Sequence, residues 1–231
     1  MSVLLTDTNL QNVKEKVLNG ERLSIEDGLT LYETPDLLGV AQLANLVNER
    51  KNGQNVYFIE NLYINPTNVC EANCGFCGFK RKPGEEGAYT MDEEALLKYV
   101  SDRWNDNIRE FHIVGGHNNE VGFDYYVNIV KTLKKHYPQV TVKAYTGAEI
   151  EFFSRLAGIS MKEVIQTLMD AGLSTLTGGG AEILTERYRA IMSLKKLLLT
   201  NGLKHTKRRT TLVYARIQRC SMAQLNQKKN V

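Results

Sequence analysis

Long apolar runs are absent from this 231-residue chain, and no stretch approaches the ~20 residues that a membrane-spanning helix needs. The first residues, MSVLLTDTNLQNVKEKVLNGE, have no basic segment ahead of their short apolar run, so they do not resemble a secretory signal peptide. Hydrophobic residues nevertheless make up 42% of the chain, enough for the core of one large domain or two small ones. We therefore expect a cytoplasmic protein with no membrane partner.

Cysteine is scarce, and its distribution is uneven. The chain has only 4 cysteines, and Cys70, Cys74 and Cys77 share the stretch INPTNVCEANCGFCGFKR with the spacing C-x3-C-x2-C, whereas Cys220 lies near the far end. The cluster holds three cysteines, whereas a disulfide framework calls for an even number and a structural zinc site normally has four closed ligands. In a reducing compartment, clustered thiols indicate a metal site or a catalytic group instead.

Acidic residues are missing from residues 193–231, which carry 10 of the 29 Lys and Arg residues. Residues 1–192 hold all 26 Asp and Glu residues against 19 Lys and Arg, a net charge of −7. One interpretation is a basic, disordered or nucleic-acid-binding tail. The other is a reading frame that is shifted after about Lys196, which makes the tail non-native and Cys220 an accident. Codons that encode this segment can, when they are read in the shifted frame, also encode strings that contain WLEAH and TMLYG.

Strands alternate with helices of about ten residues or more along most of the chain. Residues 8–52 are typical of helices, with Ser24 and Asp27 near capping-box spacing. A second capping box is predicted at Thr90 and Glu93. The predicted strands are residues 55–65, 109–116, 140–146 and 173–180, and the helices between and after them are residues 90–104, 123–138, 160–172 and 181–192.

This alternation predicts an α/β fold with βαβ units and a parallel sheet. Polar groups and glycines follow each strand, and in α/β barrels the carboxyl ends of the strands build the active site. We therefore predict the N-terminal half of a (β/α) barrel. The expected organisation is a helical N-terminal lead at 1–54, a partial barrel at 55–192 and a tail at 193–231.

Three clustered thiolates suit a cubane iron–sulfur cluster with one iron left open, because cysteine thiolates hold such clusters and the usual number is four. Gly75 and Gly78 would let the loop fold closely around it. Two alternatives remain open. One is a zinc site that recruits His112 or His117 as a fourth ligand, in a non-catalytic module with a basic nucleic-acid-binding tail; the other is a set of buried, unligated cysteines.

The cysteine loop resembles that of the radical S-adenosylmethionine (SAM) enzymes. The resemblance implies a 4Fe-4S cluster on Cys70, Cys74 and Cys77, with SAM chelating the open iron. It further implies that one aromatic residue, two backbone groups and one carboxylate contact SAM, and these are Phe76, Gly115, Gly116 and Glu149. Each of these also has a plain structural explanation, namely loop packing, a tight turn or a charge in the first turn of a helix.

The stretches YINPTNVC, GAYTMDEEAL, FHIVGGHN, VKAYTGAEI and GGGAEIL resemble the menaquinone (futalosine pathway) subgroup, most closely the aminofutalosine synthases. That implies a transferase that adds the 5′-deoxyadenosyl radical to 3-[(1-carboxyvinyl)oxy]benzoate to give 6-amino-6-deoxyfutalosine. An electron donor such as flavodoxin or ferredoxin is implied as partner, without nucleic acid. The cyclic dehypoxanthine futalosine synthases are the alternative. The candidate substrate-binding residues are His117, Gly178, Gly179, Gly180 and Glu182, for which a turn or a helix start is the structural alternative.

Overall fold

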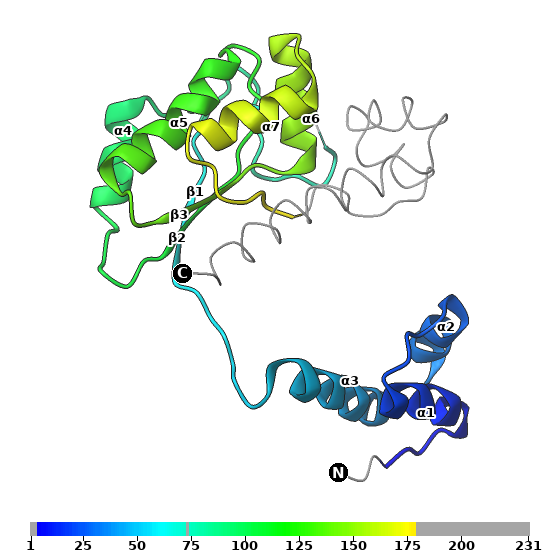
Figure 1. The fold of residues 1–231 in the computed structure, drawn as a ribbon. Helices are drawn as coiled ribbons and strands as arrows, with labels where there is room; N and C mark the ends of the chain where they lie inside the picture. The colour runs from blue at the N-terminus through cyan, green and yellow to red at the C-terminus, as the bar shows by residue number, and fades with distance from the viewer. Residues whose placement is uncertain (1–3, 73, 179–231) are drawn as a thin grey trace. The chain divides into compact units, whose positions relative to one another are not determined.

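A computed structural model describes residues 4–72 and 74–178 of the chain. The chain divides into two compact units, Met1–Phe58 and a second unit that begins at Ile59 (Figure 1). The candidate site residues Gly179, Gly180 and Glu182, the predicted helix at 181–192 and the tail at 193–231 lie outside the described residues.

The N-terminal unit is a small helical bundle. Ser24 and Asp27 form the predicted capping box, and Gly53 ends the last helix with a φ of 65°, which favours glycine. Val13, Val17 and Leu43 form its buried centre. Its elements are the 3-10 helix η1 (Thr8–Leu10), α1 (Gln11–Asn19), α2 (Ile25–Glu33) and α3 (Leu37–Asn52).

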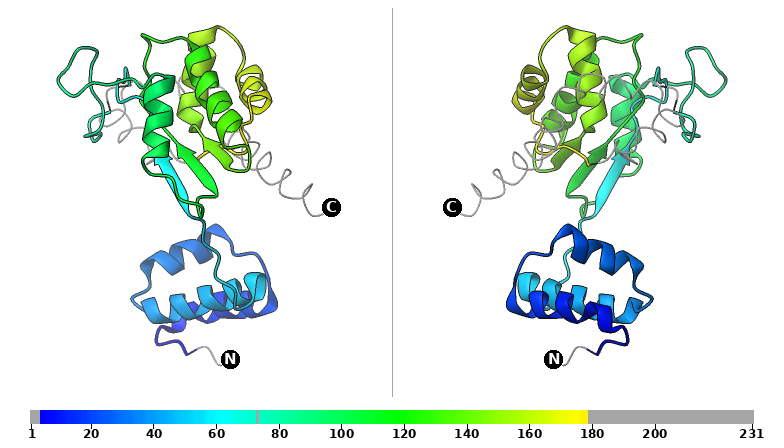
Figure 2. Two further views of the ribbon diagram at one scale, coloured as in Figure 1. Left: turned by 90° about the vertical axis from the view of Figure 1, so that its left-hand side faces the viewer. Right: turned by 90° about the vertical axis from the view of Figure 1, so that its right-hand side faces the viewer.

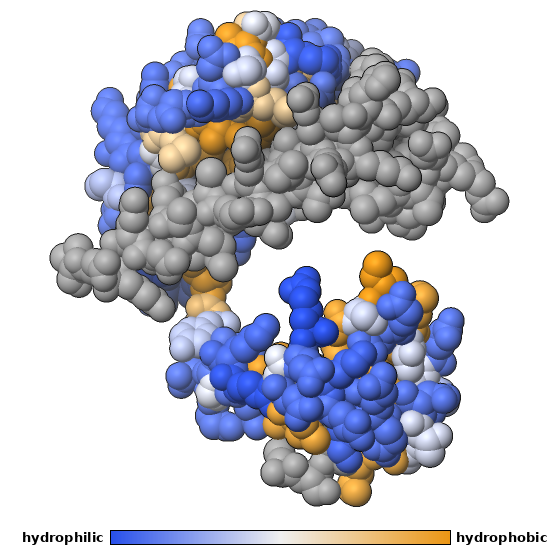
Figure 3. All heavy atoms as spheres, turned by 45° about the vertical axis from the view of Figure 1, so that its right-hand side comes forward, coloured by the Kyte–Doolittle hydropathy of each residue, from blue (hydrophilic) through white to orange (hydrophobic). Residues whose placement is uncertain are grey.

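Large apolar side chains stay exposed on this unit, and their orange surface is visible in the lower part of Figure 3. Tyr32 is 92% exposed, Ile25 80%, and Leu37 and Leu38 76% each. The buried cluster of the unit is therefore small compared with the apolar surface that its helices carry.

The second unit is built on a three-stranded parallel sheet with the order β1-β2-β3. Its strands are β1 (Asn61–Ile64), β2 (Glu110–Ile113) and β3 (Thr141–Ala144). Its helices are α4 (Glu93–Ser101), α5 (Phe123–His136), α6 (Gly147–Ala157) and α7 (Met161–Asp170). Neighbours in space are neighbours in sequence, as in a (β/α) barrel.

The core of the second unit lies between one face of the sheet and helices α4 to α7, which lie on the same side of it (Figure 2). Because side chains alternate along a strand, Leu62, Phe111 and Val142 point into this core. Tyr63, His112 and Lys143 belong to the opposite, polar face. The predicted α/β class with a parallel sheet is confirmed.

The predicted strand at 55–65 is too long. β1 begins only at Asn61, and Val56 and Phe58 are 90% and 91% exposed. The partner strand β2 starts at Glu110, which pairs with Asn61, so the preceding residues have no ladder to join. Aromatic and β-branched residues favour a strand only where a neighbouring strand is available.

The predicted capping box at Thr90 and Glu93 is wrong. Asp92 is the N-cap of α4, and its carboxylate accepts a hydrogen bond from the Ala95 N–H at 2.8 Å. Thr90 instead forms an isolated bridge with Thr67, and their hydroxyls lie 2.9 Å apart. A tertiary contact thus takes the hydroxyl that a capping box would use.

The fourth predicted strand is present as a single bridge within the described residues. Thr175 bridges Lys143 in parallel, and the Ala144 N–H donates to the Thr175 carbonyl at 3.0 Å. This segment therefore lies beside β3, where the next barrel strand belongs. Among residues 4–72 and 74–178, no helix is long and apolar enough to cross a membrane.

Candidate metal and cofactor site

The carboxyl ends of the three strands bring their loops together at one edge of the sheet. The Val114 N–H donates to the Ile64 carbonyl at 3.3 Å, and the Tyr145 N–H donates to the Ile113 carbonyl at 2.9 Å. The cysteine loop follows β1, the glycine pair follows β2, and the segment that carries Glu149 follows β3. In barrels this edge holds the active site, so it is the candidate site here.

The cysteine loop folds back on itself after β1. The Cys70 N–H donates to the Arg81 carbonyl at 3.0 Å, and the Cys77 N–H donates to the Cys74 carbonyl at 3.2 Å. The Lys80 ammonium donates to the same Cys74 carbonyl at 2.9 Å. The three thiols are therefore confined to one short loop, as the sequence predicts.

The donor set fits an iron–sulfur cluster. Cys70 and Cys77 are half-buried, and Cys74 is buried. Thiolates are the ligands that such clusters use. Within the described part of the chain, no three His, Cys, Asp or Glu side chains are placed to hold a metal ion. A cubane cluster is larger than a single ion, and each thiolate binds a different iron, so the three thiols need not converge on one point.

Gly115 and Gly116 lie where the backbone of the cysteine loop approaches closely. A Cβ on Gly116 would lie 2.1 Å from the Val69 carbonyl oxygen, and one on Gly115 would lie 3.2 Å from the Thr67 carbonyl oxygen. The Gly116 N–H donates to the Thr67 carbonyl at 2.8 Å. The glycine pair thus brings two site loops together, and its predicted contact with SAM remains a prediction.

Glu149 connects the start of α6 to the glycine pair. Its side chain is buried; Oε1 accepts the Gly115 N–H at 3.0 Å and Oε2 accepts the Thr146 N–H at 2.7 Å. The Thr146 hydroxyl in turn accepts the Glu149 N–H at 3.3 Å, which completes a capping box. Glu149 therefore caps the start of α6 and holds the glycine pair, and its predicted contact with SAM stays a prediction.

Tyr145 separates β3 from α6 in a strained conformation. Its φ is 63°, a left-handed value that is costly for a residue with a Cβ. The side chain is fully buried, its hydroxyl donates to the Tyr126 carbonyl at 2.6 Å, and burial raises the pKa of Tyr145. Strain of this kind persists only where the surroundings fix it, and it often marks functional sites.

His117 and Phe76 sit in different environments. His117 is buried, and its ring stacks on Phe152 with centroids 4.8 Å apart. Its carbonyl accepts the Glu71 N–H at 2.9 Å, which places it against the cysteine loop. Phe76 is 46% exposed on that loop. The structure thus brings His117 to the site edge and leaves Phe76 at the surface.

His112 lies on the polar face of the sheet, beside Glu110 of β2 and Lys143 of β3. Its ring contacts Tyr63, with centroids 5.3 Å apart, and burial lowers the pKa of His112. Glu110 Oε1 lies 4.0 Å from His112 Nδ1 and 3.6 Å from the Lys143 ammonium, and it accepts no hydrogen bond from the described residues. The mid-strand position of His112 predicts a core residue, and this prediction is wrong, because the side chain lies on the face of the sheet opposite the core and is 25% exposed.

Gly178 is the last described residue of its segment, and a Cβ there would meet nothing within 4 Å. The other candidate residues of this turn, Gly179, Gly180 and Glu182, lie outside the described residues. Their predicted role in binding an anionic group stays a prediction.

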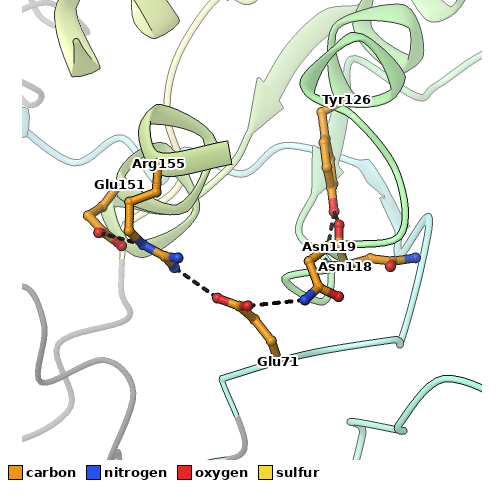
Figure 4. A network of polar contacts seen from close by, with 6 residues as sticks. All are labelled: Glu71, Asn118, Asn119, Tyr126, Glu151 and Arg155. Carbon is orange, nitrogen blue, oxygen red and sulfur yellow. Dashed lines mark hydrogen bonds and ion pairs between the residues drawn. The ribbon is translucent and has the colours of Figure 1, made fainter. Parts of the chain in front are cut away.

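Two site residues have no signal in the sequence, Glu71 and Arg155 (Figure 4). Glu71 Oε1 accepts a hydrogen bond from Arg155 Nη2 at 2.8 Å, across 84 positions of the chain. Arg155 also pairs with Glu151, one helical turn away, and that spacing is typical of an ordinary surface pair. Only the fold reveals that Arg155 reaches the residue next to Cys70.

Fold and site together define a partial (β/α) barrel with a cysteine loop at the carboxyl end of its first strand. Residues 64–199 match the model of the Radical SAM superfamily, and the chain belongs to this superfamily. Membership implies a 4Fe-4S cluster and SAM, and it favours the iron–sulfur interpretation of the thiols over the zinc module. The predicted half barrel is confirmed at this level.

The chain is 43% identical over 193 residues to aminodeoxyfutalosine synthase of Thermus thermophilus, covering 84% of this chain and 52% of the relative. It is 44% identical over 173 residues to the enzyme of the same name from Streptomyces coelicolor, covering 75% and 45%. Cyclic dehypoxanthine futalosine synthase of Halalkalibacterium halodurans is 32% identical over 204 residues, covering 87% and 55%. The predicted futalosine-pathway subgroup fits these relatives.

The chain spans about half the length of the curated relatives that it matches. Among solved structures, the FeFe-hydrogenase maturase HydG matches with a TM-score of 0.54 and 17% identity, over 86% of this chain and 51% of that one. This likeness concerns the fold alone.

Proposed function

We propose that the chain is a radical SAM enzyme of the aminodeoxyfutalosine synthase type. A bound cluster would supply the electron that cleaves SAM into methionine and a 5′-deoxyadenosyl radical. Addition of this radical to 3-[(1-carboxyvinyl)oxy]benzoate, rearrangement, loss of the carboxylate as carbon dioxide and return of one electron and one proton would give 6-amino-6-deoxyfutalosine. The observation that carries the proposal is the 43% identity to such an enzyme over a stretch that includes the cysteine loop. Flavodoxin or ferredoxin is the proposed electron donor.

In this proposal Cys70, Cys74 and Cys77 hold three irons of the cluster and leave the fourth open to SAM. The confinement of the three thiols to one loop supports this ligand set. The glycine pair supports it as well, because a Cβ at Gly116 would push that loop away from the sheet edge.

The remaining site residues take the cofactor and substrate roles expected of them. Phe76 packs near the adenine, Gly115 and Gly116 offer backbone groups to the methionine part, and Glu149 keeps that segment in place through Gly115. His117 lines the substrate side, where its carbonyl accepts a hydrogen bond from Glu71 of the cysteine loop. The anion-binding turn at Gly178, Gly179, Gly180 and Glu182 completes the set.

A cyclic dehypoxanthine futalosine synthase is the second candidate, since the chain is 32% identical to one over 204 residues. The two activities start from different substrates and give different products. Incubation of the reduced protein with SAM and either substrate, followed by mass spectrometry, therefore separates them. The higher identity to the first enzyme favours 6-amino-6-deoxyfutalosine as the product.

The ligand set is tested by anaerobic reconstitution of the full chain, iron counting and EPR spectroscopy. Cys70→Ser, Cys74→Ser and Cys77→Ser should each lose most of the bound iron and the cluster signal, because each removes a thiolate ligand. Cys220→Ser is the matched control and should keep both. A colourless protein that binds zinc and takes up no iron would refute the assignment.

We further propose that the basic tail at 193–231 is read in a shifted frame after about Lys196, so that the chain is a truncated and inactive copy. The absence of acidic residues from this segment supports the proposal. The family match that ends at residue 199 supports it as well.

A further inference from the structure

The cysteine loop is tied to the rest of the site at Glu71, the residue that follows Cys70. The Glu71 N–H donates to the His117 carbonyl at 2.9 Å, and its carboxylate accepts from Arg155 Nη2 at 2.8 Å and from Asn119 Nδ2 at 3.4 Å. Figure 4 shows the Glu71 side chain between α6 and the loop that follows β2. Glu71 therefore connects the cysteine loop to both neighbouring site segments.

Arg155 is oriented for this contact by its own helix. Its Nε donates to Glu151 Oε1 at 3.0 Å, and its guanidinium lies 5.6 Å from the centre of the Phe152 ring. The same ring stacks on His117, whose carbonyl holds the Glu71 backbone. Side chain and backbone of Glu71 are thus held by one connected group of residues.

The ion pair contributes more to the placement of the loop than to the stability of the fold. The Arg155 side chain is 44% exposed, and pairs at that exposure stabilise a protein little. The described residues of the cysteine loop form no helix or strand, so each anchoring contact has a large share in fixing the loop. Residues that orient metal ligands from outside commonly tune metal affinity in this way.

We propose that Glu71 and Arg155 are positioning residues that hold the Cys70 end of the loop in register with the glycine pair and α6. The inference rests on the proposed function, because it takes Cys70, Cys74 and Cys77 as cluster ligands. Neither side chain touches the cluster itself in this proposal. Their effect is on how readily the loop opens and on how long the loop retains iron.

The first test measures hydrogen exchange of the amides at residues 68–72 in the metal-free full chain. Glu71→Gln and Arg155→Met should speed exchange there about two- to fivefold, because an exposed ion pair is lost. Glu151→Gln is the matched control, since it removes the charge of the other partner while its amide oxygen can still accept from Arg155 Nε. It leaves the Glu71 pair in place and should change exchange little. A rise that extends equally through β1, β2 and β3 would mean global destabilisation and would overturn the proposal.

The second test measures iron release from the reconstituted chain to a chelator. Glu71→Gln and Arg155→Met should release iron faster than the wild type, and Arg155→Lys should recover part of the difference because it keeps the charge. Equal release rates in all variants, or an equal effect in Glu151→Gln, would overturn the inference. A wild-type chain that takes up no iron would refute the proposed function instead, while the exchange measurement still decides on the Glu71 contact.

Discussion

Gly116 fixes the distance between two loops of the site. Its N–H bonds the Thr67 carbonyl, and its Cα faces the Val69 carbonyl so closely that no further carbon fits. The neighbour is backbone, which cannot rotate away as a side chain can. A methyl group here must therefore displace the cysteine loop, whose geometry decides whether three thiols meet one cluster.

We predict that Gly116→Ala lowers the free energy of unfolding of the second unit by about 2–3 kcal/mol, as expected for overpacking against backbone. It should also reduce iron uptake. Trp104, the single tryptophan, packs on Tyr137 in this unit, so its fluorescence during urea unfolding reports the change. Gly122→Ala is the control, because a Cβ there meets nothing within 4 Å and should cost under about 1 kcal/mol. Equal stability of the two variants would contradict the prediction.

At the residue scale, motifs set by the local spacing of residues can be predicted from the sequence, whereas contacts between residues far apart in the chain cannot. The three thiols and the glycine pair follow from local patterns at strand ends. The pair of Glu71 with Arg155 joins residues 84 positions apart, and no local pattern marks either one. The strain at Tyr145 is likewise invisible, since an aromatic residue does not suggest a positive φ.

At the scale of the element, helix starts are predicted well where capping is local. The capping box at Ser24 forms as its spacing predicts, and Ser160 and Glu163 form another at the start of α7. Helix α6 is missing from the predicted elements as a separate helix, although Thr146, Glu149 and Gly158 give it a capping box and a glycine end. That signal was available in the sequence. The contact of Thr90 with Thr67, which replaces the predicted capping box, has no local signal in the sequence, because tertiary contacts override local preference.

The N-terminal helical unit depends on two buried carboxylates at helix starts. A hydrogen bond from Lys16 and another from the Ser24 N–H lower the pKa of Asp27. The N–H groups of Gly39 and Thr6 lower the pKa of Asp36. A lowered pKa means that the folded unit prefers the ionised form. This stabilisation is therefore present above the unfolded pKa of about 4 and is lost as the pH falls through the lowered values.

We predict that the amides of residues 11–52 lose protection from hydrogen exchange on acidification below about pH 4, after correction for the intrinsic pH dependence of exchange. The double variant Asp27→Asn and Asp36→Asn should be less protected at pH 7 and should show a flatter profile, because it has no carboxylate to protonate at either place. Protection that stays constant between pH 7 and pH 2.5 in the wild type would contradict this account.

At the scale of the whole molecule, the described residues supply only part of a barrel wall. They contain three parallel strands and one further parallel bridge, whereas a complete (β/α) barrel has eight strands. Parallel sheets are normally covered on both faces, and an open edge strand is prone to pair with other chains. The polar face that carries His112 and Lys143 is the inner face of a barrel, which the remaining strands would enclose.

The proposed frame shift leads to a prediction about the complete enzyme. The printed chain should give no 6-amino-6-deoxyfutalosine, even where its cysteine loop takes up iron, because a partial wall cannot exclude water or fix the substrate. A displacement of about 1 Å can already cost on the order of a hundredfold in rate. Restoring the frame by one nucleotide after the codon for Lys196 should recover product formation and should raise the yield of soluble, cluster-loaded protein. Both versions are compared under reducing, anaerobic conditions with SAM and substrate, and the product is measured by mass spectrometry.

The control for this comparison is a chain that ends at Lys196, which has neither the residues after the proposed shift nor their repaired counterpart. If the residues after Lys196 are a product of the wrong frame, this shortened chain should match the unrepaired chain in iron uptake and in its lack of product, since the removed segment contributes nothing to the barrel. An A-rich run at the codons for Lys195 and Lys196 would supply the natural slip site. Turnover by the printed chain at the rate of the repaired one would refute the frame shift, and it would mean that the basic segment completes the wall of the active site.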